Sequence, residues 1–251
     1  MKPAPSAGSG QVLLITGAAG VIGQAVLLRL AQDAQWRQCR WVLTAWHLEK
    51  LGPALAALKE QGIEAQGISL DMADEAGCEA FINALPGLGP FLGMALLAGI
   101  NHDDPIVRLE ETSWDRVWQV NIGFHARLLR AAGAHFAPEA RVLLVASQVG
   151  LRGNAGQVAY AAAKGALIDL MHTLPAVRVN VLLPPLVPSP LLENLSPEAL
   201  QSLFAMRSLQ DPEPALSCAE GAAYLLSDAS RYVQRQVWHA DSRVSVLGWP
   251  A

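Results

Sequence analysis

The chain has 251 residues, of which 52% are hydrophobic and 16% charged, and its formal net charge is −4. This apolar content is enough for a large core and excludes a disordered chain. A mildly acidic chain without basic blocks lacks the clustered Lys and Arg that nucleic-acid binding needs, so we expect no nucleic-acid partner.

The N-terminal segment and the cysteines predict a soluble cytoplasmic protein. Residues 1–10 are rich in Pro, Ser, Gly and Ala and contain no apolar run, which favours a disordered tail over a signal peptide. No uninterrupted apolar stretch approaches the roughly 20 residues of a membrane-spanning helix. The three cysteines, Cys39, Cys78 and Cys218, are widely spaced, which is typical of buried free thiols in a reducing compartment.

Short apolar runs alternate with longer segments of helical periodicity. The runs predict strands at residues 12–16, 41–45, 65–70, 91–97, 141–146, 177–183 and 236–240, and stretches such as residues 12–15 and 142–145 do not alternate with polar residues. Such strands are buried on both faces of a parallel sheet. The segments between them predict helices at 21–32, 48–61, 74–84, 112–136, 157–173 and 217–226. This alternation predicts an α/β fold, a Rossmann-type doubly wound parallel sheet of about seven strands with helices on both faces.

No linker divides the interior, so residues 11–251 are predicted to form one domain. Prolines are dense in residues 184–190 and occur again at Pro212 and Pro214. They bracket a segment near 190–210 that is predicted to form a mobile helical flap over a site.

A Gly-rich turn at residues 16–23 joins the first predicted strand to the first predicted helix. A tight turn lets the backbone approach a pyrophosphate, and the helix N-terminus supplies free N–H groups and a positive dipole end. Gly17, Gly20, Ile22 and Gly23 are therefore candidate cofactor-binding residues. The alternative is a turn without a ligand, but the strand before it and the helix after it favour a dinucleotide site.

The ends of the second and third predicted strands bear on the choice of cofactor. Asp71, followed by Met72, could accept a hydrogen bond from adenine or could cap the next helix. After the second strand an acid would bind the ribose 2′-hydroxyl of NAD, and an Arg would bind a 2′-phosphate. The chain has Trp46 and His47 there, and the missing acid favours NADP(H) over NAD(H). Trp46 could stack on adenine or be packing material.

Four polar residues form a candidate catalytic set. Tyr160 and Lys164 are four apart in a predicted helix and so share one face. A cation there would lower the pKa of the phenol and make Tyr160 a proton donor at neutral pH. Ser147 ends the fifth strand and could hydrogen-bond a substrate carbonyl, and a water relay to Lys164 would give Asn121 a partner. The alternative for Tyr160 and Lys164 is a solvated helix face.

From about residue 11 to 241 the chain resembles the short-chain dehydrogenase/reductase family. The matching motifs are residues 16–23, Asp71, Ala98-Gly99, Asn121, Ser147, Tyr160, Lys164 and Arg178-Val179-Asn180. Residues 99–104 and 114–117 are most similar to 3-oxoacyl-(acyl carrier protein) reductases and related ketoreductases. The resemblance implies Tyr160 as general acid, Lys164 as its pKa-lowering partner and ribose anchor, Ser147 as carbonyl orienter and Asn121 as relay holder. It also implies cofactor contacts by Ala98, Gly99, Tyr160, Lys164, Val187 and Ser189.

The resemblance implies an NADPH-dependent reduction of a 3-oxoacyl thioester, bound to acyl carrier protein, in fatty-acid or polyketide biosynthesis. It also implies an oligomer of like or related subunits. We expect no metal, because His102, Asp103 and Asp104 are adjacent in a loop and cannot all turn inward.

Several positions depart from the family pattern. Leu96-Leu97 replace a pair of Asn, and Pro184-Pro185 replace Pro-Gly, which removes an N–H and fixes φ beside the nicotinamide. Gln234-Arg235 and Ser242-Arg243 also replace residues that are usual there. The segment 164–178 is short and contains Pro175, so the helix from about residue 157 must end early and alter a subunit interface. These departures leave a second hypothesis, a catalytically impaired structural subunit that pairs with an active ketoreductase.

Overall fold

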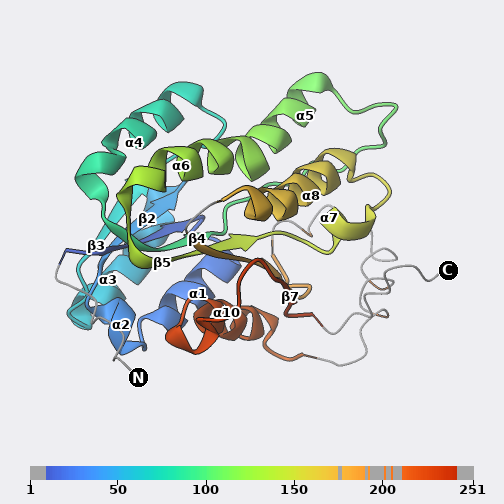
Figure 1. Cartoon of the computed structure of the whole chain (residues 1–251). Helices are drawn as coiled ribbons and strands as arrows, with labels where there is room; N and C mark the ends of the chain where they lie inside the picture. The colour runs from blue at the N-terminus through green and yellow to red at the C-terminus, as the bar shows by residue number, and fades with distance from the viewer. Residues whose placement is uncertain are drawn as a thin grey trace.

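Figure 1 shows the computed structural model of the chain, which describes residues 10–174, 177–189, 192, 201, 205 and 211–241. In this part of the chain seven strands form one sheet: β1 (Val12–Thr16), β2 (Arg40–Ala45), β3 (Ala65–Ser69), β4 (Phe91–Leu96), β5 (Phe136–Val145), β6 (Arg178–Leu183) and β7 (Val237–His239). Their order is β3-β2-β1-β4-β5-β6-β7, and all neighbouring pairs are parallel. The predicted doubly wound α/β fold is confirmed.

Two layers of helices cover the sheet (Figure 1). The main helices are α1 (Val21–Leu30), α2 (Ala34–Arg37), α3 (Gly52–Glu60), α4 (Glu75–Leu88), α5 (Glu111–Trp118), α6 (Phe124–Ala132), α7 (Val149–Arg152), α8 (Val158–Thr173) and α10 (Pro214–Leu225). The short turns are η1 (Leu48–Leu51), η2 (Gln119–Gly123), η3 (Gly133–His135) and η5 (Asp228–Ser230). Helices α4, α6 and α8 lie on one face of the sheet, and α1, α3 and α10 lie on the other.

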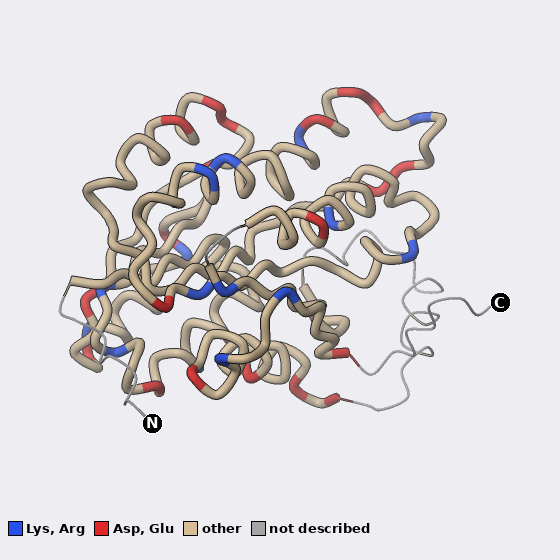
Figure 2. Tube along the Cα trace, viewed as in Figure 1, with Lys and Arg blue, Asp and Glu red and all other residues tan. Residues whose placement is uncertain are grey.

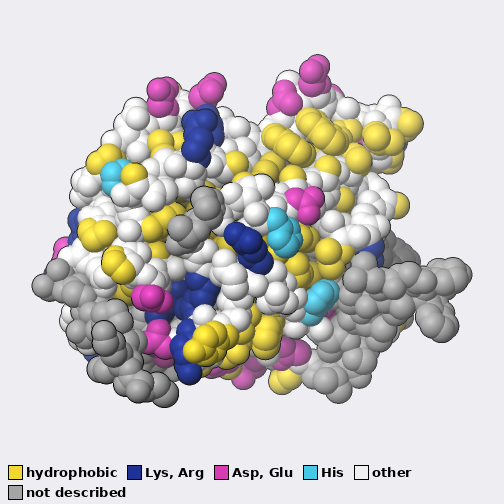
Figure 3. Space-filling view, in the orientation of Figure 1, with side chains coloured by type: hydrophobic (Ala, Val, Ile, Leu, Met, Phe, Trp, Pro, Cys, Tyr) yellow, Lys and Arg dark blue, Asp and Glu magenta, His cyan; other side chains and the backbone are white. Residues whose placement is uncertain are grey.

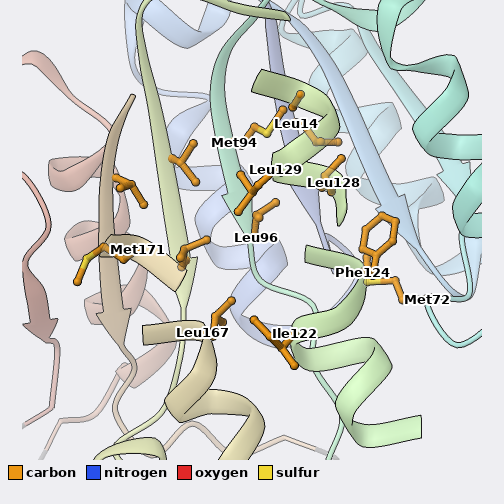
Figure 4. Packing of buried hydrophobic residues seen from close by; sticks show 14 of the residues in the cluster. Leu14, Met72, Met94, Leu96, Ile122, Phe124, Leu128, Leu129, Leu167 and Met171 are labelled. Atoms are coloured by element: carbon orange, nitrogen blue, oxygen red, sulfur yellow. The ribbon is translucent and has the colours of Figure 1, made fainter. Parts of the chain in front are cut away.

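The core has two halves, one on each face of the sheet. On one face, Leu14 and Leu96 from the central strands pack with Leu128 of α6 and Leu167 of α8 (Figure 4). On the other face, the intervening strand residues pack against α1 and α10. Each fully buried side chain of this size stabilises the fold by about 1.5–3 kcal/mol. Burial on both faces explains why the central strands contain uninterrupted apolar stretches such as residues 12–15 and 142–145.

Charged side chains lie away from the carboxyl ends of the strands. Among the described strands, β2, β5 and β6 carry Lys, Arg, Asp or Glu, and these residues are Arg40, Glu139, Arg141 and Arg178, each in the first part or middle of its strand (Figure 2). The carboxyl edge of the sheet is therefore formed by uncharged strand ends and by the loops that follow them, which is where ligands bind in such sheets.

Several predicted elements differ from the structure; for example, the predicted helix 48–61 is divided into η1 and α3. Strand β5 begins at Phe136, earlier than predicted, because Pro138 and Glu139 interrupt the apolar run although the backbone is already extended. The predicted helix 112–136 is divided into α5, η2, α6 and η3.

Other predictions are confirmed or lie outside the described residues. Helix α8 ends at Thr173, as the short segment before β6 required, and the three cysteines are buried and free. The tail at residues 1–9, most of the predicted flap at 190–210, Pro175 and residues 242–243 are outside the described residues. No helix in the described ranges is long and apolar enough to cross a membrane.

Candidate active site

The site lies where the sheet reverses its winding, between β1 and β4. The chain leaves these neighbouring strands in opposite directions, so their carboxyl ends open a crevice. The Thr16 hydroxyl accepts hydrogen bonds from the N–H groups of Leu97 (3.1 Å) and Ala98 (3.4 Å). Thr16 thus joins the two strand ends, at the position where Leu97 replaces the family's Asn.

The Gly-rich turn leaves no room for side chains at two positions. Gly17 has φ +65°, and a Cβ there would lie 2.7 Å from Ala98 Cα. A Cβ on Gly23 would lie 2.2 Å from the carbonyl oxygen of Gly17. No side chain caps α1 at Gly20, so the N–H groups of its first turn stay open to a ligand. This backbone fits the pyrophosphate of a dinucleotide.

A cavity of about 410 Å³ opens in front of this turn. It brings together most of the predicted cofactor residues: Gly17, Gly20, Ile22, Gly23, Trp46, Asp71, Met72, Ala98, Gly99 and Ser189. Three predicted cofactor residues, Tyr160, Lys164 and Val187, are not part of the lining, and of these Lys164 and Val187 are buried. The lining also contains residues that the sequence did not single out, among them His47, Lys50, Ile100 and Arg116. Arg116 lies in residues 114–117, which resemble the ketoreductases, and this resemblance is the sequence feature that could have identified it as a site residue.

Charged and aromatic side chains surround the outer part of the cavity. Trp46 is 56% exposed and stacks on His47, with 4.7 Å between the ring centroids. The Arg116 guanidinium lies 5.3 Å from the Trp46 ring centroid, and its Nη2 lies 3.7 Å from Asp71 Oδ2. Asp71 accepts a hydrogen bond from the N–H of Ala73, whereas Asp74 caps α4. The alternative that Asp71 caps this helix is therefore wrong.

Asn121 lies in η2, a π-helical turn between α5 and α6. Its side-chain Nδ2 donates to the carbonyl oxygens of Ile100 and Val117, both at 2.8 Å. Both amide hydrogens are thus used, and the orientation of the amide is fixed. Asn121 Oδ1 is buried and has no hydrogen-bond partner in the described part of the chain. An acceptor in this state requires a donor from water or a ligand.

Lys164 is 3% exposed, and its Nζ donates to the carbonyl oxygen of Val145 at 3.0 Å. Burial lowers the pKa of this ammonium to about 8. A Cβ on Gly99 would lie 2.7 Å from Asn121 Oδ1 and 3.0 Å from Lys164 Nζ. Gly99 is thus the point where the cavity, the Asn121 amide and the Lys164 ammonium meet.

Ser147 and Tyr160 complete the catalytic set. Burial and the charge of Asp103 raise the pKa of Tyr160 to about 12, and the nearby Ser147 hydroxyl, which favours the phenolate, does not offset this rise. The expectation that Lys164 lowers the pKa of the phenol is wrong for this structure. Lys164 Nζ lies 5.6 Å from the Tyr160 ring centroid and donates to Val145 instead.

This arrangement suits proton donation. A phenol with a raised pKa stays protonated at neutral pH, and the Ser147 hydroxyl beside it can hydrogen-bond the same acceptor atom. The alternative of a solvated Tyr–Lys face is wrong, because Lys164 is buried.

Comparison with known proteins gives consistent results. Residues 11–199 match the family model for short chain dehydrogenases. The chain is 30% identical over 236 residues to the 3-oxoacyl-(acyl carrier protein) reductase of Pseudomonas aeruginosa, covering 89% of this chain and 93% of that protein. It is 33% identical over 194 residues to the short-chain reductase protein NovJ of Streptomyces niveus, covering 74% and 72%. A solved structure described as a short-chain alcohol dehydrogenase of Sinorhizobium meliloti has a TM-score of 0.81 at 24% identity, covering 93% of this chain and 96% of that one, which supports the fold alone.

Proposed function

Since the chain belongs to the short-chain dehydrogenase family and is an NAD(P)-dependent oxidoreductase, we propose that it reduces a 3-oxoacyl thioester with NADPH. The observation that carries this proposal is the clustering of Tyr160, Lys164 and Asn121 beside the Gly99 edge of the cavity. Lys164 Nζ lies 5.6 Å from the Tyr160 ring centroid, and Gly99 lies against both Lys164 Nζ and Asn121 Oδ1. Asn121 comes from η2, Tyr160 and Lys164 come from α8, and Ser147 lies in the loop that follows β5.

The reaction needs one hydride and one proton. A dihydronicotinamide held in the cavity beside Gly99 and Ser189 would supply the hydride, with both electrons, to the carbonyl carbon of the substrate. Tyr160 donates its hydroxyl proton to the carbonyl oxygen as the C=O π bond breaks, and the product is a 3-hydroxyacyl thioester. Ser147 hydrogen-bonds the same oxygen and stabilises the charge that develops on it. The Lys164 ammonium and Asn121 Oδ1 hold the water through which Tyr160 regains a proton.

Charge around the cavity supports NADPH over NADH. Among the described residues of the lining, Asp71 is the acid, and Arg116 already pairs with it. Lys50 lines the cavity beyond the end of β2, where a ribose 2′-phosphate would lie, and no acid faces it in the lining. His47 also lines this end, and its Nδ1 lies 3.4 Å from Glu49 Oε1.

We expect Lys50→Glu to weaken NADPH binding about 10–100-fold relative to NADH, because a charge-assisted bond contributes about 1.5–3 kcal/mol and each 1.4 kcal/mol changes a dissociation constant tenfold. The measurement is the dissociation constant of each cofactor by nicotinamide fluorescence. Lys59→Glu is the matched control, since Lys59 is exposed on α3 and lies outside the cavity lining. An equal loss for both cofactors would contradict the assignment of Lys50 to the 2′-phosphate.

A carrier-bound thioester is supported by the relatives. The protein of Pseudomonas aeruginosa is a reductase of 3-oxoacyl groups on acyl carrier protein, and the similarity covers nearly the full length of both chains. We expect the purified chain to oxidise NADPH with 3-oxoacyl thioesters, and faster with the carrier-bound thioester than with the pantetheine thioester. Equal rates would reject the carrier protein as a partner. No turnover of either thioester by a chain that binds NADPH would reject the ketoreductase.

An oligomer is supported by exposed apolar side chains over α5 and the loop that leads into it (Figure 3). In that loop Ile106 and Val107 are 69% and 88% exposed, and Trp118 is exposed at the end of α5. Exposed apolar groups of this kind are typical of protein interfaces. The second hypothesis, an impaired structural subunit, is less favoured because Asn121, Lys164 and Tyr160 lie close together and Ser147 lies near Tyr160.

A further inference from the structure

A histidine that belongs to none of the predicted site residues lies directly behind Asn121. His125 is on α6, one helical turn after Asn121, and is completely buried. Its Nδ1 lies 3.1 Å from the backbone carbonyl oxygen of Asn121. A carbonyl oxygen only accepts, so Nδ1 must carry the hydrogen of this bond. Burial and the charge of Lys164 lower the pKa of His125 to about 4, so the ring is neutral at physiological pH.

The bond acts on an irregular part of the helix. In η2 the N–H of Phe124 donates to Gln119, five residues back, rather than to the residue four back. Such π-helical turns shift the backbone hydrogen bonds and are frequent at functional sites. The side chain of His125 therefore supports a carbonyl group inside the displaced turn.

Asn121 is consequently held at three points. Its amide hydrogens donate to Ile100 and Val117, and its backbone carbonyl accepts from His125. The remaining polar atom of Asn121 is its side-chain Oδ1. This acceptor is buried and lies beside Gly99 and Lys164 Nζ. His125 Nε2 is also buried and has no partner in the described part of the chain, so the bond to Asn121 is the one specific polar contact of the ring shown there.

We propose that His125 is a positioning residue: its Nδ1–H fixes the π-helical turn, and through that turn it places Asn121 Oδ1 against Lys164 for proton resupply to Tyr160. The kinetic part of this inference rests on the proposed function. The tautomer that it requires, neutral with hydrogen on Nδ1, is independent of any activity.

Three substitutions at His125 distinguish the effect of the position of the N–H donor from the effects of side-chain burial and volume. His125→Asn keeps an N–H donor two bonds from Cβ, where Nδ1 stands, whereas His125→Gln moves the donor one bond farther. His125→Leu keeps apolar volume without a donor. We expect His125→Leu and His125→Gln to lower kcat about 10–100-fold, the cost of misplacing a catalytic group. We expect His125→Asn to stay within about threefold of the wild type, because it restores the hydrogen bond.

The cofactor provides the internal control. His125 does not line the cavity, so NADPH affinity should be unchanged in all three variants and the loss should fall on kcat. Equal activity of the Asn and Gln variants, or full activity of the Leu variant, would overturn the inference.

Nitrogen NMR of the wild-type chain tests the tautomer without any variant. We expect a neutral ring with hydrogen on Nδ1 from about pH 5 to pH 8. A charged ring or the opposite tautomer would overturn the inference even if the variants fail to fold. A wild-type chain that shows this tautomer but turns over no 3-oxoacyl thioester would reject the proposed function and leave the hydrogen-bond assignment standing.

Discussion

Replacement of Tyr160 by Phe is expected to lower turnover of a 3-oxoacyl thioester by about 10²–10⁴-fold, the usual contribution of a general acid. The substitution removes one hydroxyl and keeps the ring, so the fold should remain. The pKa of about 12 means that Tyr160 is protonated throughout the neutral range, and no other phenol is described near Ser147 to replace it. Steady-state kcat with saturating NADPH is the measurement.

Cofactor binding separates this result from damage to the site. The affinity for NADPH should change by less than about tenfold, since the substitution costs at most one hydrogen bond to the cofactor. Tyr232→Phe is the matched control, because Tyr232 is 88% exposed and outside the site. Turnover of Tyr160→Phe close to the wild type would contradict the role of Tyr160 as proton donor.

The fold could be predicted because burial in the core leaves a pattern of apolar residues in the sequence. Strands covered on both faces contain uninterrupted apolar stretches, as residues 12–15 do in β1. The start of β5 could not be predicted in this way. Phe136 pairs with Phe91 of β4, the register then shifts so that Arg141 is opposite Gly93, and residues 137–140 between them carry no apolar periodicity. The π-helical turn at Asn121 likewise has no local signal, since its hydrogen bonds depend on Ile100 and on packing against α8.

The candidate site was predictable to the level of residue identity and not to the level of electrostatics. The spacing of Tyr160 and Lys164 placed them on one face of a helix, but it gave no measure of burial. Burial is what moves both pKa values, that of Tyr160 up to about 12 and that of Lys164 down to about 8. Lys50 and His125 were missed because tertiary packing determines their positions. Lys50 of η1 lines the cavity, and His125 of α6 contacts the backbone of Asn121 in η2.

Lys164→Met is expected to abolish most of the turnover and, at the same time, to stabilise the fold at pH 7. The buried ammonium has a pKa of about 8 against an ordinary 10.5, so the folded state disfavours its charged form. This difference corresponds to roughly 3 kcal/mol, and the lost bond to Val145 offsets about 1 kcal/mol of it. We therefore expect the free energy of unfolding to rise by about 1–3 kcal/mol in urea at pH 7.

The dependence on pH identifies the cause of this gain. Below pH 8 Lys164 carries its proton in both the folded and the unfolded chain, and the full cost of the buried charge applies. Between about pH 8 and 10.5 the unfolded chain binds more protons than the folded chain, so the stability of the wild type rises with pH and the advantage of Lys164→Met disappears. Wild-type turnover should fall as the pH increases through about 8, because the Lys164 ammonium loses its charge. Lys59→Met, at an exposed position on α3, should show neither effect.

A stability gain of Lys164→Met that is constant from pH 7 to 10 would contradict the buried charge as its origin. Wild-type reduction that continues undiminished above pH 9 would contradict a requirement for the Lys164 cation.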